Sequence, residues 1–549
     1  MASFGQVTKG SLSGSVIDAS GALIADAVLK AINTQTGTVL QAVSDKSGGF
    51  HFKMLAPGTY RIEISKDGFG PRKLENILVS TSVDTGLGML SLGVAGDQST
   101  VEVTASTTLI EATQAQITNT FSARSIAQFA GVNENQGLDN LALLVPGINS
   151  SRDLDYGDVN GATIASNGSR SRSNDQQIDG QNNNDNSVTG PALVLSDAEF
   201  ADEYQIITSN FGPEYGRNGG SVINVVTKSG TNKIHGSVYG FWTNNDLQSL
   251  NSYQKNFQGL TTLPRSNTEF GGFTIGFPIV KDRLFFFNGF DQKLFHESSV
   301  YTSGSVSPTQ MGLIEAAGCS FVHANALAAL KSYGPYAFSN GNPTAIGNPI
   351  QSKITSDTGS TCPIEYGYVT RSVPERQHIF NWLPRADYAN GKDAIVARYI
   401  LARNNTFDLA DNGPAGWFED FPWLSQAIKL GWTRVITQNI VNELSVGFGR
   451  QKLQFGGSSN HSDPTVADLK TGLTNVSIGS TGQGFTSLGY GPSTIMPSGR
   501  VVNTWQIQDN LNYQLSRHQL KAGVNWTFQR SPNTFLPLVN GQLDRKSVV

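Results

Sequence analysis

Three patterns of hydrophobic and polar positions follow one another along the chain. In the first, over residues 10–93, short apolar runs alternate with glycine-rich turns. Strands spaced about 8–12 residues apart are typical of an all-β sandwich. The predicted strands are Gly14–Ile17, Val28–Asn33, Val39–Ser44, Phe50–Phe52, Gly58–Ile64, Lys73–Val79 and Gly88–Leu92.

The second pattern, over residues 107–232, follows a short connector at 94–106 and is rich in Asn, Ser and Gly. Such a polar composition is typical of partly disordered segments. The apolar runs Leu141–Val145 and Val222–Val226 favour a small α/β domain instead.

The third pattern, over residues 233–543, consists of segments about ten residues long with strict alternation, as in a transmembrane β-barrel. In one segment, Val524, Trp526 and Phe528 share a face, while Asn525 and Thr527 share the other. We predict that the apolar face meets lipid and that the polar face lines the lumen. The nine predicted strands are 233–243, 269–279, 283–293, 378–388, 394–403, 425–437, 440–454, 502–514 and 519–529.

The connections between these segments alternate in length, which favours a barrel over a soluble sandwich. Turns such as 390–393 are short, whereas residues 295–377 and 456–500 form long connections. Short turns at one end and long loops at the other are typical of outer-membrane barrels, and loops beyond about 15 residues are uncommon in soluble domains. Four tryptophans are candidates for an interfacial aromatic girdle: Trp242, Trp432, Trp505 and Trp526.

Composition and charge narrow the functional classes. The net charge of −4 gives no sign of the basic patch that nucleic-acid binding needs. No apolar run approaches the ~18 residues of a spanning helix, so a closed barrel is the way left for such a chain to cross a bilayer. The seven histidines form no H-E-x-x-H motif, and no G-x-S-x-G or Walker motif occurs. We therefore expect no enzyme, no catalytic residue, no metal site and no cofactor.

Several motifs resemble those of a known family. Residues Gly14–Asp18, Gly49–Phe52 and Leu55–Tyr60 resemble the carboxypeptidase regulatory-like domain, a transthyretin-like sandwich without catalytic groups. The run EYGRNGGSVINVVTKSGTNKIHG, from Glu214 to Gly236, resembles the plug-to-barrel junction of TonB-dependent outer-membrane receptors of the Oar-like branch. KDRLFFFNGFDQ, from Lys281 to Gln292, resembles their early hairpin.

This resemblance implies a mainly β protein in the outer membrane of a Gram-negative cell, with a periplasmic sandwich, a plug and the first strands of a large barrel. Family barrels have roughly 22 strands, so nine strands cannot close, and we expect a signal peptide upstream and more strands downstream. Residues 544–549 have no strand pattern and are interpreted as a possible non-native tail.

The implied function is energised uptake of an oligosaccharide, peptide or siderophore. The implied partners are TonB with ExbB and ExbD, outer-membrane lipid and an extracellular ligand. Adhesion or a secretion-linked role without energised uptake is the alternative. The segment Val101-Glu102-Val103-Thr104-Ala105 resembles a TonB box; an ordinary linker or the last sandwich strand is the other interpretation.

Candidate site residues in the plug are polar, and both a ligand-facing and a structural role remain open for them. The arginines are candidates for ion pairs with barrel acids such as Glu443, and the asparagine cluster for hydrogen bonds to a ligand. The ligand-facing candidates are Arg170, Arg172, Asp179, Asn182, Asn183, Asn184, Asp185 and Arg217.

The two cysteines, Cys319 and Cys362, lie in one long polar stretch. A disulfide closing a surface loop is one interpretation in an oxidising compartment. Two free thiols are the other.

Overall fold

The computed structural model describes most of the chain, in several stretches. These are residues 9–94 except 82, 103–104, 115–129, 137–150, 164–170, 173–185, 198–256 except 213, 217 and 218, 261–306, 347–355, 361–410, 418–457 except 438, 475–478, 488–490, 498–535 except 516 and 517, and 542–543. The statements below concern these residues.

The N-terminal domain is a two-sheet sandwich that contains all seven predicted strands. One sheet has the order β4-β1-β7 and the other the order β3-β2-β5-β6-β8. The strands are β1 (Gly10–Asp18), β2 (Val28–Asn33), β3 (Val39–Val43), β4 (Gly49–Leu55), β5 (Gly58–Ser65), β6 (Arg72–Val79), β7 (Asp84–Leu92) and β8 (Val103–Thr104). Alternate apolar residues of both sheets, such as Leu29, Ile62 and Leu90, form its core.

Two similar turns connect the sandwich strands. Asp18 accepts hydrogen bonds from the backbone N–H groups of Ser20 and Ala22, both at 2.8 Å. Asp45 accepts in the same way from Ser47, at 2.7 Å, and from Gly49, at 3.0 Å. Local bonds of this kind are the reason that aspartate is favoured in turns. The hydrogen bond from the Ser20 hydroxyl contributes most to holding the pKa of Asp18 below its ordinary value.

The plug is a small mixed α/β domain, as the two apolar runs predict. Its five-stranded sheet has the order β13-β12-β15-β14-β9. The strands are β9 (Ile117–Ser122), β12 (Asp175–Ile178), β13 (Gln181–Asn182), β14 (Ala201–Ser209) and β15 (Val222–Thr227). Beside them lie α1 (Ala123–Gln128), the 3-10 helices η2 (Gly137–Leu144) and η4 (Ala198–Phe200), and a hairpin of β10 (Ile148–Ser150) and β11 (Ile164–Ser166).

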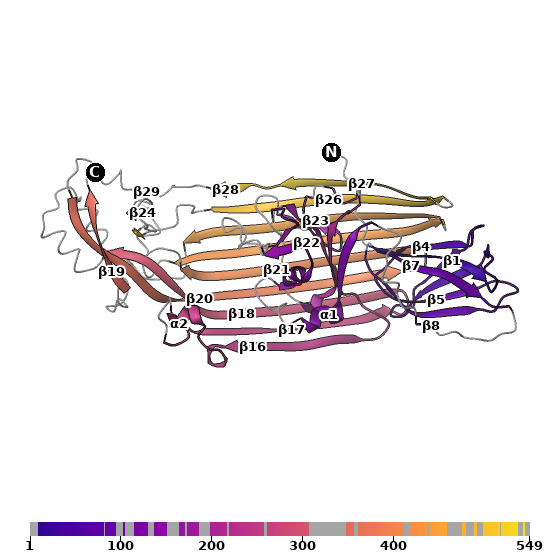
Figure 1. Cartoon of the computed structure of the whole chain (residues 1–549), viewed down its shortest axis with the longest axis horizontal. Coiled ribbons are helices and arrows are strands. Elements are labelled where there is room, and N and C mark those ends of the chain that lie inside the picture. Colours follow the sequence, from indigo (N-terminus) through magenta and orange to yellow (C-terminus); the bar gives the residue numbers. More distant parts are fainter. Residues whose placement is uncertain are drawn as a thin grey trace.

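All nine predicted barrel strands are confirmed, as consecutive neighbours in one antiparallel sheet. They are β16 (His235–Asn244), β17 (Ser266–Val280), β18 (Leu284–Val306), β20 (Thr361–Ala389), β21 (Asp393–Ala410), β22 (Phe418–Thr437), β23 (Ile440–Gly457), β26 (Ser498–Leu515) and β27 (His518–Arg530). Most extend beyond the predicted bounds at the end with the long connections. Within the described residues the sheet is not closed, because β16 and β27 lie at opposite edges (Figure 1).

Shorter elements accompany the large sheet. They are η5 (Asn245–Leu247), α2 (Ser252–Asn256), β19 (Gly347–Thr355), β24 (Asn475–Ile478), β25 (Leu488–Tyr490), β28 (Asn533–Phe535) and β29 (Gln542–Leu543). Among the described residues, none of the helices is both long enough and apolar enough to cross a bilayer.

The two faces of the large sheet differ as the alternation predicts. On β26, Gln506 and Gln508 are buried toward the plug, whereas Trp505 and Ile507 point outward and are exposed. The outermost apolar side chains are almost free of contacts: Val238 is 89% exposed. Because water would not stabilise such a surface, this face is suited to lipid. The four candidate girdle tryptophans all lie on it and are exposed.

The sandwich and the long connections lie at opposite ends of the large sheet, and the plug lies against its inner face (Figure 1). We name the end beside the sandwich the turn end, and the end with the long connections the loop end. The turn between β20 and β21 shows why the turn end is compact. Gly391 has a φ of +85°, and the Asn390 N–H donates to the Asp393 carbonyl at 3.0 Å. The plug core continues into the wall, because Leu383 and Ile400 of the large sheet pack against plug residues such as Tyr204.

Candidate functional site

The site is built on the two-residue turn between β12 and β13. Asp179 and Gly180 occupy this turn, with φ values of +49° and +71°. An Asp-Gly pair with both residues at positive φ is the usual solution for a tight hairpin. The turn projects the Asp179 carboxylate from the plug toward the wall, between β21 and β20.

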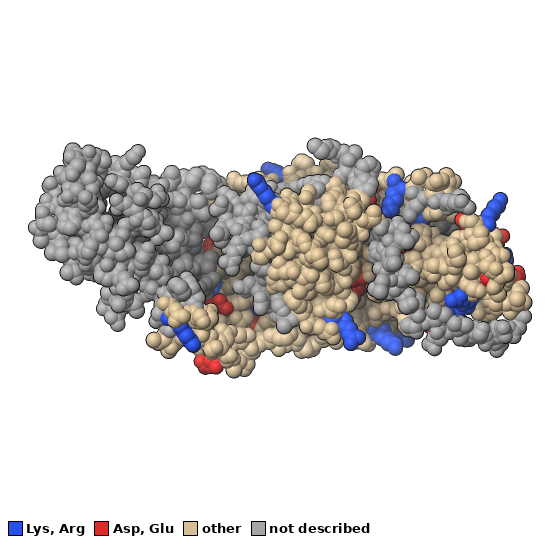
Figure 2. Space-filling view, viewed as in Figure 1, with Lys and Arg blue, Asp and Glu red and all other residues tan. Residues whose placement is uncertain are grey.

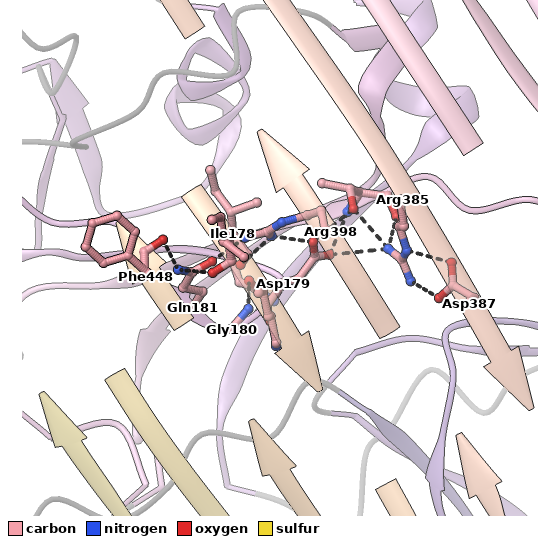
Figure 3. Close-up of polar contacts among 12 residues, drawn as sticks. Ile178, Asp179, Gly180, Gln181, Arg385, Asp387, Arg398 and Phe448 are labelled. Carbon is pink, nitrogen blue, oxygen red and sulfur yellow. Dashed lines mark hydrogen bonds and ion pairs between the residues drawn. The ribbon is translucent and has the colours of Figure 1, made fainter. Parts of the chain in front are cut away.

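Asp179 is the centre of a buried ionic network (Figure 3). Its Oδ2 atom lies 2.5 Å from Nη1 of Arg398 on β21, and its Oδ1 atom lies 3.6 Å from Nη1 of Arg385 on β20. Within the plug, its carboxylate accepts from the N–H and the hydroxyl of Thr227, at 2.8 and 2.9 Å. Arg385 is in turn held by Asp387, at 2.8 Å. A buried carboxylate is stable when it is paired in this way.

Further hydrogen bonds, from side chains to backbone carbonyls, join the residues around the turn to the wall. Gln181 Nε2 donates to the carbonyls of Ile428 and Phe448, at 3.0 and 3.2 Å, and Lys429 Nζ donates to the Asp179 carbonyl. Arg398 Nη1 also donates to the carbonyl of Ile178, at 3.0 Å. These bonds fix the hairpin tip to β21, β22 and β23, and Gln508 of β26 also donates to the Gly180 carbonyl, at 3.4 Å.

A second ionic contact lies a few residues further along the plug. Asp185 is buried, and Arg500 of β26 contacts its Oδ2 atom through both Nε and Nη2, each at 2.8 Å. Together the two carboxylates join the plug to the wall at well-separated strands.

Between these two contacts lies a narrow pocket, which we name the interface pocket. Its plug side is Asn182–Asn184, and its wall is lined by Ser425, Gln426, Ala427, Gly449, Arg450, Gln451, Val502 and Thr504. The inward-facing wall residues form two rows across neighbouring strands, Ser425–Gln451–Val502 and Ala427–Gly449–Thr504.

Gln451 is the unusual member of this pocket. It is 1% exposed, and neither its Nε2 nor its Oε1 atom has a hydrogen-bond partner. A buried amide without partners costs free energy. Beside it, Gly449 leaves open space, because a Cβ atom placed there would have no neighbour within 4 Å. The pocket thus presents both a free donor and a free acceptor next to unfilled volume.

The described candidate residues divide between these features. Asp179 and Asp185 are ion-pair partners of the wall, and Asn182, Asn183 and Asn184 line the interface pocket. Asn184 also has structural bonds, since it donates to Asp175 at 2.8 Å and accepts from the Gln176 N–H at 3.1 Å.

Of the three candidate plug arginines, the structure describes Arg170, which takes no part in these ion pairs. Arg170 is exposed, and Arg172 and Arg217 lie outside the described residues. The ion pairs above have the opposite polarity to the predicted one, because the plug supplies the acids and the wall the cations. A third pair repeats this, with Lys521 of β27 at 3.4 Å from Glu214 of the plug.

The described part of the box-like segment pairs with the sandwich, and its role as a TonB box stays a prediction. Val103 and Thr104 form β8, which pairs in parallel with Leu74 and Glu75 of β6. The alternative of a last sandwich strand fits this pairing. Val101, Glu102 and Ala105 lie outside the described residues.

The cysteine prediction stays a prediction. Cys362 lies in β20, and Cys319 lies outside the described residues. In the described part of the chain, His, Cys, Asp and Glu side chains form no group of three that could hold a metal ion.

The wall residues of the site were missed by sequence reasoning. Arg385, Arg398, Lys429, Arg500 and Gln451 were not singled out. A usable signal was present, because a cation on the inward side of an alternating strand needs a buried partner. On the drawn face, described charged side chains are scattered rather than gathered in one patch (Figure 2).

Comparison with known proteins decides the family. The model of an outer membrane beta barrel domain matches residues 226–545, which is more than half of the chain. The chain belongs to this outer-membrane β-barrel family. A carboxypeptidase regulatory-like domain matches residues 11–89. The resemblance drawn from the sequence motifs is thereby confirmed, and the sandwich is the regulatory-like domain.

The chain is also similar to individual proteins. The chain is 31% identical over 288 residues to the TonB-dependent transporter Oar of Myxococcus xanthus, a match to 50% of this chain and 26% of Oar. Among solved structures, the outer-membrane transporter YddB from Escherichia coli matches with a TM-score of 0.49 and 12% identity, over 76% of this chain and 48% of YddB. The siderophore receptor PirA from Acinetobacter baumannii matches with a TM-score of 0.45 and 14% identity, over 75% and 48%. The chain thus spans about a quarter of Oar and about half of each of these structures.

Proposed function

We propose that this outer-membrane β-barrel protein is a receptor that imports a solute across the outer membrane, with energy supplied through TonB, ExbB and ExbD. The sandwich then lies in the periplasm and the loop end faces the outside. The observation that carries the proposal is the plug itself: a folded domain bonded into the inner face of a barrel wall, with a polar pocket between the two.

The plug contacts favour transport over a purely structural role. The large sheet holds the plug by apolar contacts at residues such as Leu383 and Ile400, but around the pocket it does so by ion pairs at Asp179 and Asp185 and by few apolar side chains. Polar contacts of this kind can be exchanged for water or for other partners when the plug rearranges. A permanent closure would be better served by apolar packing, because replacing a buried ion pair by apolar side chains is often stabilising.

The interface pocket favours a neutral ligand rich in hydroxyl or amide groups. Its lining has amides and hydroxyls and no carboxylate, and its one cation, Arg450, is exposed. A buried glutamine with both amide atoms free is complementary to a group that both donates and accepts a hydrogen bond. Sugar hydroxyls have this property, so we propose an oligosaccharide as the substrate rather than a charged ferric siderophore.

Oar is named a TonB-dependent transporter, which is the relative's property and supports the proposed coupling here. Adhesion or a secretion-linked role is the competing function. Neither of these roles requires a ligand pocket between the plug and the wall.

A binding experiment tests the pocket. The full-length receptor is titrated with a pool of fluorescently labelled neutral oligosaccharides. Gln451→Leu removes both free amide atoms at nearly constant volume, and Gly449→Val fills the open space. We expect each to weaken binding by at least about tenfold, which is the effect of losing one to two good hydrogen bonds.

The matched control is Gln454→Leu, because Gln454 lies on the same strand and is exposed. It should bind as the wild type does. Equal affinity of the wild type and both pocket variants for the oligosaccharides would contradict the proposed ligand site, and binding of labelled peptides or a ferric siderophore instead would contradict the substrate class.

A further inference from the structure

The turn that follows β6 of the sandwich inserts into the plug. Thr81 in this turn is fully buried, and its N–H donates to Oε2 of Glu203 at 3.1 Å. Gln205 Nε2 donates to the Thr81 carbonyl. Glu203 and Gln205 are themselves buried residues of β14. One sandwich residue is thus held by two side chains of one plug strand, through both of its backbone polar groups.

The sandwich also contacts the turn end of the large sheet. The Gln35 carbonyl accepts from the N–H of Asn232 at 3.0 Å. Gly37 lies so close to the β17–β18 turn that a Cβ atom there would be 2.3 Å from Oδ1 of Asp282. On β26, the side-chain amide of Asn512 contacts the sulfur of Met54 at 3.8 Å. These contacts position the sandwich so that the Thr81 turn reaches β14.

The position of β14 in the plug sheet determines which movements of the plug this contact opposes. In the plug sheet, β14 lies between β15 and β9, and β9 is the first strand of the plug after the sandwich. Displacing β9 or rotating the plug breaks the pairing of β14 or carries β14 along. Any movement that carries β14 along has to release Thr81 from Glu203 and Gln205.

We propose that the sandwich is a latch: while docked, it holds β14 and keeps the plug in its closed arrangement, and it has to detach before the plug can rearrange. The role in gating rests on the proposed transport function. The latch contact and its test do not, because they concern only the sandwich and the plug.

The docking surface is suited to release because it is polar. Besides the bonds above, it brings Lys53 of the sandwich close to Lys521 of the wall. Lys53 is nearly buried and its Nζ has no hydrogen-bond partner. Burial, followed by the neighbouring Lys521 charge, lowers the pKa of Lys53 to about 8. Burying the Lys53 charge makes docking of the sandwich less favourable, so this interface is more easily opened than an apolar one.

Hydrogen exchange of the full-length receptor tests the latch without any ligand. Gln205→Ala removes the bond to the Thr81 carbonyl but leaves the Thr81 N–H its own acceptor, Glu203. If the bond to Gln205 holds the sandwich in place, amide exchange at Thr81 and in β14 should become about fivefold faster, which is the effect of one typical hydrogen bond. The matched control Gln41→Ala, at an exposed position of β3, should exchange like the wild type.

A reversible crosslink separates docking from a local effect. Gly37→Cys with Asp282→Cys, in the Gln205→Ala background, is designed to join the sandwich to the wall at the close contact, where a Cβ atom at position 37 would lie 3.2 Å from Cγ of Asp282. Both positions have a positive φ, which a cysteine adopts at some cost in free energy. Oxidation should return exchange at Thr81 and in β14 close to wild-type rates, and reduction should reverse this. Each single cysteine variant shows whether the substitution alone disturbs the fold.

The latch is overturned if Gln205→Ala leaves both exchange rates unchanged. It is equally overturned if oxidation fails to restore them, since the faster exchange would then arise within the plug alone. If the latch holds but the receptor transports nothing, the contact stands and the proposed function falls.

Discussion

Asp179 shows how much of the plug–wall contact depends on one side chain. Its carboxylate contacts Arg398 and Arg385 of the wall and Thr227 of the plug. Arg398 has a side chain only 1% exposed. Removing the negative charge therefore leaves a buried cation without its counterion, which is a costlier change than losing a surface pair.

We predict that Asp179→Asn destabilises the plug within the receptor by about 3–5 kcal/mol, the usual effect of breaking a buried ion pair. Chemical denaturation, followed by the fluorescence of a dye attached to the plug, measures this change in stability. The matched control is Glu214→Gln, because its partner Lys521 is half exposed and such pairs contribute about 0–1 kcal/mol. Equal effects of the two substitutions would contradict the central role of Asp179.

Lys53 supplies a pH dependence at the docked sandwich. The pKa of Lys53 is lowered to about 8 from an ordinary 10.5, by burial and by Lys521. Below pH 8 the folded protein carries the unfavourable charge. Between pH 8 and 10.5 the unfolded chain binds a proton that the folded chain does not, so stability rises with pH over that range.

Lys53→Met should therefore raise the stability of the docked sandwich at pH 7, by about 1–3 kcal/mol, and the gain should shrink toward pH 10. Calorimetry of the intact receptor at both pH values measures it. Lys30→Met, at an exposed position of β2, is the control and should change little at either pH. A gain for Lys53→Met that is independent of pH would contradict this account.

At the scale of elements, the alternation of apolar and polar residues was sufficient to predict the strands. Two-residue periodicity needs only local information, so all seven predicted sandwich strands and all nine predicted strands of the large sheet are present, whereas the short strands β19 and β28 that pair with the large sheet were not predicted. The strand ends were less predictable. β20 begins at Thr361, well before the predicted 378, because pairing with β18, and with β19 at its first residues, extends the strand where the sequence no longer alternates.

The site was predictable only on the plug side. Asp179 and the asparagines stand out because they form a short polar motif in the sequence. Their partners in the wall do not stand out. Arg398 is 219 residues from Asp179 in the sequence, and Gln451 reaches the pocket only through the register of its strand. The polarity of the ion pairs depends equally on the arrangement of the folded strands, which no local pattern encodes.

The segment β8 carries the prediction about energy coupling. An extended segment can pair with an exposed sheet edge of a partner through its backbone. Val103 already pairs with β6, so coupling through this segment would require that TonB displace it from the sandwich. Val103→Pro removes an N–H group and fixes φ, and it should abolish energised uptake of labelled oligosaccharides while surface binding persists.

Val103→Ala is the control for this prediction, because it keeps the backbone N–H, and it should retain most of the uptake. Circular dichroism of both variants should show the sandwich and the barrel still folded. Normal uptake by Val103→Pro would mean that another segment couples to TonB or that uptake is not energised in this way.

At the scale of the whole molecule, the sandwich contacts the plug and the plug contacts the large sheet. The sandwich holds β14 of the plug through Thr81, and the plug holds the wall through Asp179 and Asp185. The interface pocket lies beside the last of these contacts. A ligand bound at Asn182–Asn184 and a force applied at the sandwich therefore act on the same small domain from opposite ends, which is the arrangement that coupled uptake requires.

Uptake of the labelled oligosaccharide pool by cells that carry the full-length receptor tests the central claim most directly. Internal fluorescence is compared with and without a protonophore, and surface binding is measured in parallel. The account predicts that the protonophore abolishes accumulation and leaves surface binding unchanged, and that Gly449→Val lowers both. Accumulation that is equal with and without the proton gradient, or binding without any accumulation, would contradict energised import by this protein.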